Sequence, residues 1–173
     1  TERMCRARGA ESDTEGNTAP LDPPEDLRAV DIEVPGDISS AAFFLVAGAI
    51  VPGSELTIKN VGVNPTRTGI LDVLRDMGAD ISISNFRDNA EPVCDLTVKH
   101  SALRGVEIGG SIIPRLIDEL PVIAVAAAFP EGETVLRDPH ELKVTEPNRI
   151  PPSVHHLTRA RAHASRPQTS PHR

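Results

Sequence analysis

Two apolar patterns run along positions 38–137: continuous runs and strict alternation. Residues 41–51 (AAFFLVAGAIV) are apolar on every side, which predicts a helix that is buried all round. Asp37, Ser39 and Ser40 stand at its start, where their side chains can accept hydrogen bonds from the first free N–H groups. Residues 114–129 form a similar run and predict a second buried helix.

Shorter segments alternate between apolar and polar residues, as half-buried strands do. This alternation predicts extended segments at 29–34 (with Val30, Ile32 and Val34 on one face), 55–61, 80–85 and 95–100. Two further segments favour helices. Residues 1–10 contain helix formers and end near Gly9, and residues 64–77 have an amphipathic pattern with Asn64 as N-cap, Pro65 in the first turn and Gly78 beyond the end.

The order of elements starts again after residue 105. VEIGG (106–110) corresponds to IEVPG (32–36), and EGETVLRD (131–138) to PGSELTIKN (52–60), at an offset of roughly 75–79 residues. The pattern predicts an α/β fold of repeats, each with strand, helix, strand, helix and two more strands, of which about one and a half copies are present. The second copy breaks off near Ile150, and residues 151–173 lack periodicity, so we expect them to be unstructured.

Composition narrows the class of protein. Hydrophobic residues make up 39% of the chain and aromatic residues 2%, so the core must consist of Val, Ile, Leu and Ala. Two cysteines provide no disulfide framework or metal-binding spacing, which favours a reducing compartment, the cytoplasm. The longest apolar runs, 41–51 and 120–129, are shorter than the ~18 residues of a membrane span, and no signal peptide opens the chain, so we expect a soluble protein.

The charge is uneven along the chain. The net charge is −7, but residues 151–173 contain four Arg, four His and no acidic residue. Positions 1–150 therefore hold 14 basic and 25 acidic residues, a net charge of −11. An acidic body argues against nucleic-acid binding, because phosphate contacts need clustered Lys and Arg.

Four short stretches could carry chemistry, and each has a purely structural alternative. GDISS (36–40) could bind an anion at a helix start or be an ordinary cap. IDELP (117–121) places Asp118 and Glu119 in an apolar run, either as a general base with a raised pKa or as first-turn acids facing solvent. Arg67 in NPTRTG could meet an anion or lie on the surface, and Glu146 and Arg149 in TEPNR could form a plain helix pair.

Taken together, the stretches TERM…RARGAE, DIEVPGDISSAAFFLVAGAIVPGSELTIKNVGVNPTRTG and GGSIIPRLIDELPVIAVAAAF resemble the bacterial 5-enolpyruvylshikimate-3-phosphate (EPSP) synthase family, the 3-phosphoshikimate 1-carboxyvinyltransferases. The resemblance implies a transferase of the shikimate pathway of aromatic amino acid biosynthesis. Such an enzyme moves the enolpyruvyl group of phosphoenolpyruvate to shikimate 3-phosphate by addition and elimination. It implies no metal or organic cofactor, a monomer, and two domains of three repeats with helices inside and sheets outside.

The resemblance also implies roles for individual residues. Asp118 matches the general base toward the substrate hydroxyl, in an apolar helix that would tune its pKa. Glu146 matches the acid that shares proton transfer with the methylene carbon, and Arg149 matches a ligand of phosphoenolpyruvate. The remaining matches are to substrate-binding positions: Asp37, Ser39, Ser40 and Thr145.

One turn departs from the family pattern. Where the family reads Lys-Glu-Thr-Asn/Asp-Arg, residues 145–149 read TEPNR. Thr145 supplies neither the positive charge nor the proton of the lysine, and Pro147 removes an N–H and stiffens the turn.

By the same resemblance, residues 1–29 are predicted to end an N-terminal domain and link it to the next. Residues 30–150 would be part of a C-terminal enolpyruvyl transferase domain, and residues 151–173 a tail unlike the family. We therefore expect an incomplete chain that is inactive by itself. One alternative is a non-catalytic polypeptide that binds an anion or a partner weakly at most. Another is that the basic tail, residues 151–173, acts as an interaction segment for an acidic protein or nucleic acid.

Overall fold

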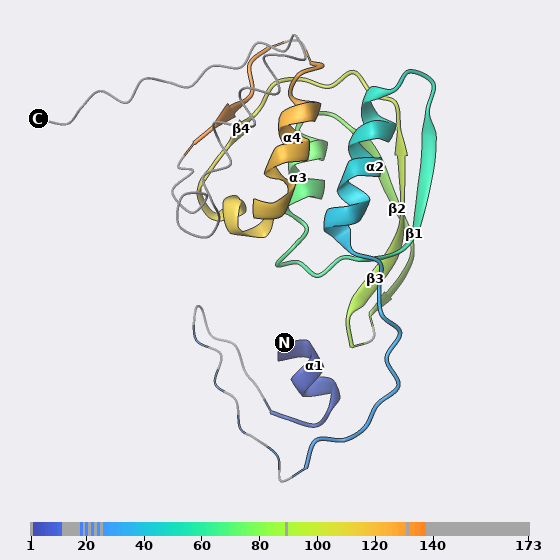
Figure 1. Ribbon diagram of the computed structural model, residues 1–173, viewed down its shortest axis with the longest axis vertical. Coiled ribbons are helices and arrows are strands. Elements are labelled where there is room, and N and C mark those ends of the chain that lie inside the picture. The colour runs from blue at the N-terminus through green and yellow to red at the C-terminus, as the bar shows by residue number, and fades with distance from the viewer. Residues whose placement is uncertain are drawn as a thin grey trace, which may run out of the picture.

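The computed structural model describes residues 2–11, 18, 20, 22, 24, 26–88, 90–130 and 132–137. The elements in chain order are α1 (Glu2–Ala7), α2 (Ile38–Ile50), β1 (Glu55–Gly62), α3 (Gly69–Asp76), β2 (Asp80–Asp88), β3 (Pro92–Lys99), β4 (Glu107–Ile108), the 3₁₀ helices η1 (Gly110–Arg115) and η2 (Ile117–Glu119), α4 (Leu120–Ala126) and β5 (Val135–Leu136). The helices α2, α3 and α4 lie to one side of the antiparallel sheet β1-β3-β2 (Figure 1). The mixed α/β architecture confirms the predicted fold class.

Helix α2 lies in the middle of the described core. It packs on β1 and β3 and against α4, and its buried positions include Leu45, Val46 and Ala49. Its predicted start is confirmed, because Asp37 accepts hydrogen bonds from the Ser40 N–H and hydroxyl at 2.8 and 2.9 Å. The prediction that α2 is buried on every side is wrong for this structure: Phe43 and Phe44 are 61% and 58% exposed, because the sheet and α4 cover only part of its circumference.

Asp95 on the central strand β3 joins two β-bulges. Both neighbouring strands shift register, β1 between Ile58 and Val61 and β2 between Ser84 and Arg87. Asn60 and Asn85 occupy these bulges with φ of 56° and 52°, a left-handed conformation that Asn tolerates well. The Asp95 carboxylate accepts the Asn60 N–H at 2.9 Å and the Asn85 side-chain amide at 2.8 Å. One buried acid therefore holds the bends of both flanking strands.

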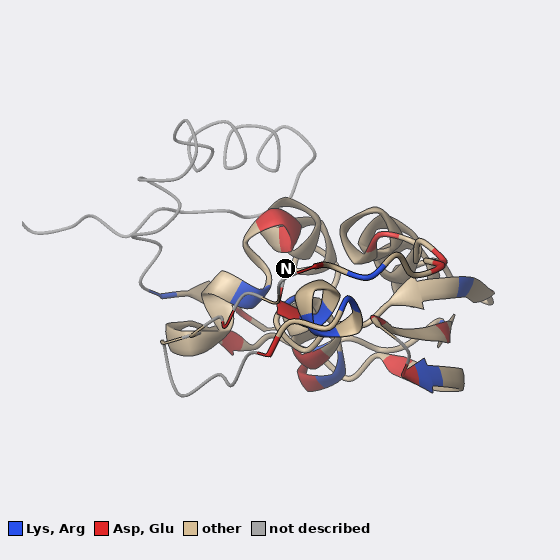
Figure 2. Cartoon of the chain, turned by 90° about the horizontal axis from the view of Figure 1, so that it is seen from below, with Lys and Arg blue, Asp and Glu red and all other residues tan. Residues whose placement is uncertain are grey.

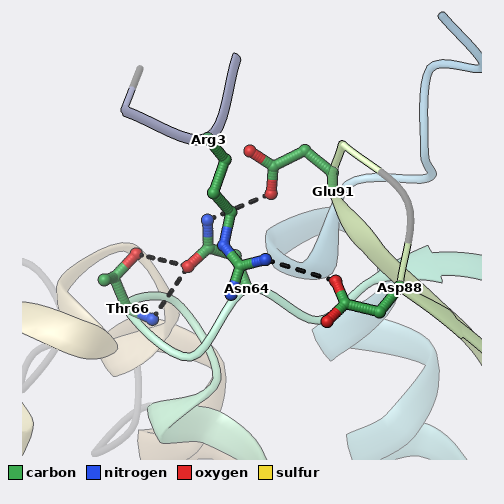
Figure 3. Close-up of polar contacts among 5 residues, drawn as sticks. All are labelled: Arg3, Asn64, Thr66, Asp88 and Glu91. Atoms are coloured by element: carbon green, nitrogen blue, oxygen red, sulfur yellow. Dashed lines mark hydrogen bonds and ion pairs between the residues drawn. The ribbon is translucent and has the colours of Figure 1, made fainter. Parts of the chain in front are cut away.

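Two segments predicted from alternation or amphipathicity differ in the structure. Residues 29–34 form no strand, and Val34 is 83% exposed, since an alternating segment needs a partner strand to bond with and only Gly36 bridges to Val61. The predicted helix at 64–77 begins at Gly69 instead of Asn64. The Asn64 side chain instead accepts the Thr66 N–H and hydroxyl, forming an Asx turn, and donates to Glu91 at 3.0 Å (Figure 3).

The predicted helix at 114–129 is also shorter than expected. Only Leu120–Ala126 is α-helical, and the residues before it form η1 and η2. Pro121 accounts for the late start, because its ring clashes with the carbonyl four residues earlier and it has no N–H to bond there. Proline is tolerated in a first turn, so α4 can begin at Leu120.

Other predictions are confirmed by the described residues. Helix α1 ends before Gly9, which has φ of 94°. Strands β1, β2 and β3 cover residues 55–61, 80–85 and 95–99 of the predicted alternating segments, and the core consists mainly of Val, Ile, Leu and Ala, with Met77 and Cys94. The two repeat copies share one parallel contact, between the segment that precedes the buried helix and the strand that follows this helix. In the first copy Gly36 bridges to Val61, and in the second copy β4 pairs with β5. Among the described residues, no helix has the length and apolar character to cross a membrane.

Candidate functional site

Three segments distant in sequence meet around the start of α2. The Ser39 hydroxyl donates a hydrogen bond to the carboxylate of Glu119, which ends η2. The same hydroxyl accepts a hydrogen bond of 3.0 Å from Arg67 in the loop before α3. Arg67 also forms an ion pair of 3.3 Å with Asp37. We call Asp37, Ser39, Arg67 and Glu119 the Ser39 cluster, a chain of acid, guanidinium, hydroxyl and acid.

Backbone geometry places Asp37 at one end of this cluster. The Gly36 N–H donates to the Asn60 carbonyl at 2.7 Å, and the Gly62 N–H donates to the Gly36 carbonyl at 2.8 Å, so the bulge in β1 fixes the residue before Asp37. Partial burial raises the pKa of Asp37, but hydrogen bonds from Ser40 and Ser39 and the charge of Arg67 outweigh it and leave the pKa below its ordinary value. Asp37 is therefore an anionic anchor.

Glu119 has the opposite electrostatic character. The residue is 4% exposed, and burial raises the pKa of its carboxyl, as does the neighbouring charge of Asp118. The hydrogen bond from Ser39 opposes this rise in part, and the pKa stays above its ordinary value. A carboxyl in this state holds a proton more readily than an exposed one.

The structure corrects the expected setting of Asp118. Sequence reasoning placed it within an apolar helix, but it lies in the short turn η2 and its side chain is exposed. The buried acid of IDELP is the next residue, Glu119. The two readings of this stretch thus apply to different residues: Asp118 faces solvent, and Glu119 is buried with a partner.

Arg115 ties the segment before Asp118 to the same loop. Its guanidinium donates to the Pro65 carbonyl at 2.8 Å and to the Thr68 hydroxyl at 3.1 Å, and it pairs with Asp72 at 2.9 Å. Sequence reasoning did not single out Arg115. Its only signal was a cation three residues before an acid, which is common on surfaces.

The other predicted site residues fall into two groups. The Ser40 hydroxyl bonds to Asp37 and so belongs to the helix cap. Thr145, Glu146 and Arg149 lie outside the described residues. Within the described part of the chain, no group of three or more His, Cys, Asp or Glu could hold a metal ion. Along the described part of the chain, the Lys and Arg positions are interspersed with Asp and Glu positions (Figure 2).

Chemically, this arrangement combines the exposed carboxylate of Asp118 with a hydrogen-bond network that starts at the next residue, the buried Glu119, and continues to the half-exposed Arg67 and Asp37. Asp118 can accept a proton from a bound hydroxyl group, while the Ser39 cluster and Arg115 hold the backbone on either side of it.

Sequence comparisons with known proteins all match the same family. A sequence model described as EPSP synthase (3-phosphoshikimate 1-carboxyvinyltransferase) matches residues 1–168, which includes most of the segment 151–173 that sequence analysis separated as a tail. The 3-phosphoshikimate 1-carboxyvinyltransferase of Geobacillus kaustophilus is 63% identical over 151 residues, 87% of this chain and 35% of that protein. That of Bacillus cereus strain G9842 is 58% identical over 160 residues, 92% of this chain and 37% of that protein.

Solved structures agree with the sequence comparison. An EPSP synthase structure from Acinetobacter baumannii matches with a TM-score of 0.85 at 43% identity, covering 91% of this chain and 36% of that one. An enolpyruvyl transferase from Streptomyces tendae shares the fold, with a TM-score of 0.58 at 23% identity over 76% of this chain and 30% of that one. The chain thus spans about 35% of the length of its Geobacillus relative.

Proposed function

The chain belongs to the EPSP synthase family, and on this basis we propose that it contributes part of an enolpyruvyl-transfer site with Asp118 as general base. The substrates would be shikimate 3-phosphate and phosphoenolpyruvate. The observation that carries the proposal is the 63% identity to a 3-phosphoshikimate 1-carboxyvinyltransferase over 151 residues. The exposed carboxylate of Asp118 on a tethered turn is compatible with this role.

In the proposed reaction, the substrate hydroxyl oxygen bonds to the enolpyruvyl carbon as Asp118 removes the hydroxyl proton, and the methylene carbon takes up a proton. The tetrahedral intermediate then loses one proton of the new methyl group and expels phosphate, which restores the double bond. A general base must lie within hydrogen-bonding reach of the proton that it removes, and an exposed carboxylate meets this need once substrate is bound. Glu146 would share the proton transfers at the methylene carbon, and Arg149 would bind phosphoenolpyruvate.

We propose that the isolated chain does not complete the reaction. It spans about 35% of its Geobacillus relative, and a transfer between two anionic substrates needs several converging cations. Thr145 supplies no charge where the family has a lysine. Removing one such stabilising group typically costs about 2.7–4 kcal/mol of transition-state stabilisation.

Phosphate release from the two substrates tests the proposal. The chain is assayed alone and after mixing with the segments of the Geobacillus kaustophilus relative that it does not match, each time with and without Thr145→Lys. We expect no turnover alone, and turnover in the mixture that increases with Thr145→Lys and disappears with Asp118→Asn. A mixture that stays inactive with Thr145→Lys would favour a non-catalytic polypeptide, and turnover that survives Asp118→Asn would exclude this base.

Three further expectations belong to the same proposal: a cytoplasmic location, a monomeric state, and domain boundaries near residues 29/30 and 150/151. Light scattering of the purified chain would test the monomer. Limited proteolysis would test the boundaries, with cleavage expected first near residue 30 and beyond residue 150.

A further inference from the structure

The turn that carries Asp118 has little support from its own backbone. Helix η2 comprises three residues, Ile117–Glu119, and Leu116 before it has φ of −147°. The Glu119 N–H donates to the Leu116 carbonyl at 3.0 Å, which closes a single 3₁₀ turn. Hydrogen-bond geometry in 3₁₀ turns is poorer than in α-helices, so one short turn does not by itself hold a side chain in one place.

Side chains on both sides of Asp118 supply the missing support. Three residues before it, Arg115 is fastened to the loop before α3 by hydrogen bonds to Pro65 and Thr68, and to α3 itself by the ion pair with Asp72. One residue after it, the Glu119 carboxylate is fastened to α2 by the Ser39 hydroxyl. The two tethers hold the turn against two different helices.

The Ser39 tether is itself held in place. Arg67 donates to the Ser39 hydroxyl oxygen, which leaves the hydroxyl proton free to point at Glu119. Arg67 is in turn oriented by Asp37, the N-cap of α2. Because Glu119 is almost fully buried, its carboxylate has a strong preference for a hydrogen-bonded position, and this preference fixes where the turn lies.

We propose that Glu119, through Ser39, is a positioning residue for Asp118. The buried carboxylate holds η2 so that the adjacent exposed carboxylate keeps one direction toward bound substrate. This inference rests on the proposed function for its catalytic consequence but not for the tether itself. Glu119 does not touch substrate in this proposal.

Two variants and a matched control test the tether in the full 173-residue chain. Ser39→Ala removes the donor, and Glu119→Leu removes the acceptor. Ser54→Ala is the control, because the Ser54 hydroxyl bonds the Val51 carbonyl at 2.8 Å at the opposite end of the same helix. Hydrogen exchange of the backbone amide at position 119 is measured by NMR, with amides of β3 as the reference for folding.

We expect Ser39→Ala to speed exchange at position 119 about three- to tenfold, the factor that corresponds to one net hydrogen bond, while β3 stays protected. Glu119→Leu should have an equal or larger effect. Glu119→Gln, which keeps an acceptor oxygen for Ser39, should restore exchange to within about twofold of the wild-type rate. Ser54→Ala should leave position 119 unchanged.

The catalytic consequence is measured in the mixture with the relative's segments. Glu119→Leu should lower kcat by about tenfold or more and leave KM unchanged, because a displaced base slows the chemical step without weakening substrate binding. Unchanged exchange at position 119 in both Ser39→Ala and Glu119→Leu would overturn the inference, as would unchanged kcat despite faster exchange. If the mixture shows no turnover even with Thr145→Lys, the proposed function fails and the exchange measurement alone decides whether Glu119 holds the turn.

Discussion

Replacing Gly48 by alanine tests how closely α2 approaches the sheet. A Cβ atom at Gly48 would lie 2.4 Å from Cγ1 of Val98 and 3.6 Å from Cβ of Leu56. Carbon atoms rest about 3.5–4.0 Å apart, so the helix or the valine must move by roughly 1 Å. Val98 is fully buried and β-branched, which leaves it little freedom to rotate away.

Two opposing terms decide the sign of the effect. Overpacking a core of this kind costs about 1–3 kcal/mol, and stiff neighbours favour the upper half of that range. Alanine is better than glycine in a helix interior by about 1 kcal/mol. We therefore expect Gly48→Ala to lower the free energy of unfolding by about 1–2 kcal/mol, measured by urea unfolding with circular dichroism at unchanged m-value.

A double-mutant cycle with Val98→Ala separates packing from other effects. Val98→Ala alone should cost about 2 kcal/mol, from the two methyl carbons lost and the cavity left. In the double variant the added methyl at position 48 enters that cavity, so the loss should be smaller than the sum by about 1–3 kcal/mol. If Gly48→Ala instead stabilised the chain and the two changes were additive, the close approach of α2 to β3 would be refuted.

Two further predictions concern pH. Hydrogen bonds from the Asn85 side chain and the Asn60 N–H hold the pKa of Asp95 below its ordinary value, so Asp95 stabilises the fold above its unfolded-state pKa and this stabilisation is lost as pH falls through its folded-state pKa. We expect Asp95→Asn to lower the free energy of unfolding at neutral pH and to flatten its decline at acidic pH. Parallel curves of unfolding free energy against pH for the wild type and the variant would contradict this prediction. Burial raises the pKa of Glu119, so the wild-type chain should lose stability as pH rises from the unfolded-state pKa of this residue through its folded-state pKa. In urea unfolding above about pH 4, Glu119→Gln should remove that loss of stability. An undiminished loss in the variant would exclude Glu119 as its source.

The sequence pattern predicted well those features that depend on neighbouring residues. The start of α2 follows from an acid and two serines ahead of an apolar run, and the antiparallel strands β2 and β3 from alternation on both sides of a polar connection. The core of small aliphatic residues follows from the composition. These features depend on side-chain periodicity and local hydrogen bonds, which a reader of one sequence can evaluate.

Predictions failed where a segment needed a distant partner or a competing local bond. Residues 29–34 have the alternation of a strand but find no partner strand in the described part of the chain. Asn64 had the composition of a helix cap, yet its side chain bonds to Thr66 and Glu91 and the helix begins later. In both cases the residues adopt a backbone conformation other than the predicted strand or helix. The periodicity of the sequence does not indicate which of the two conformations is preferred.

The sequence by itself determined the family, the class of fold, the helix α2, the strands β1, β2 and β3, and the acids worth testing. Only the tertiary structure decided which acid of IDELP is buried, and that Glu119 meets Ser39 across 80 residues of chain. It also decided that Arg115 binds the loop before α3, and that Arg67 in this loop binds the start of α2. The physical reason is that the burial of a side chain and its hydrogen-bond partners depend on how whole helices and strands pack. Packing brings together residues that are far apart in the sequence, and the sequence pattern around each residue does not indicate which distant residue it contacts.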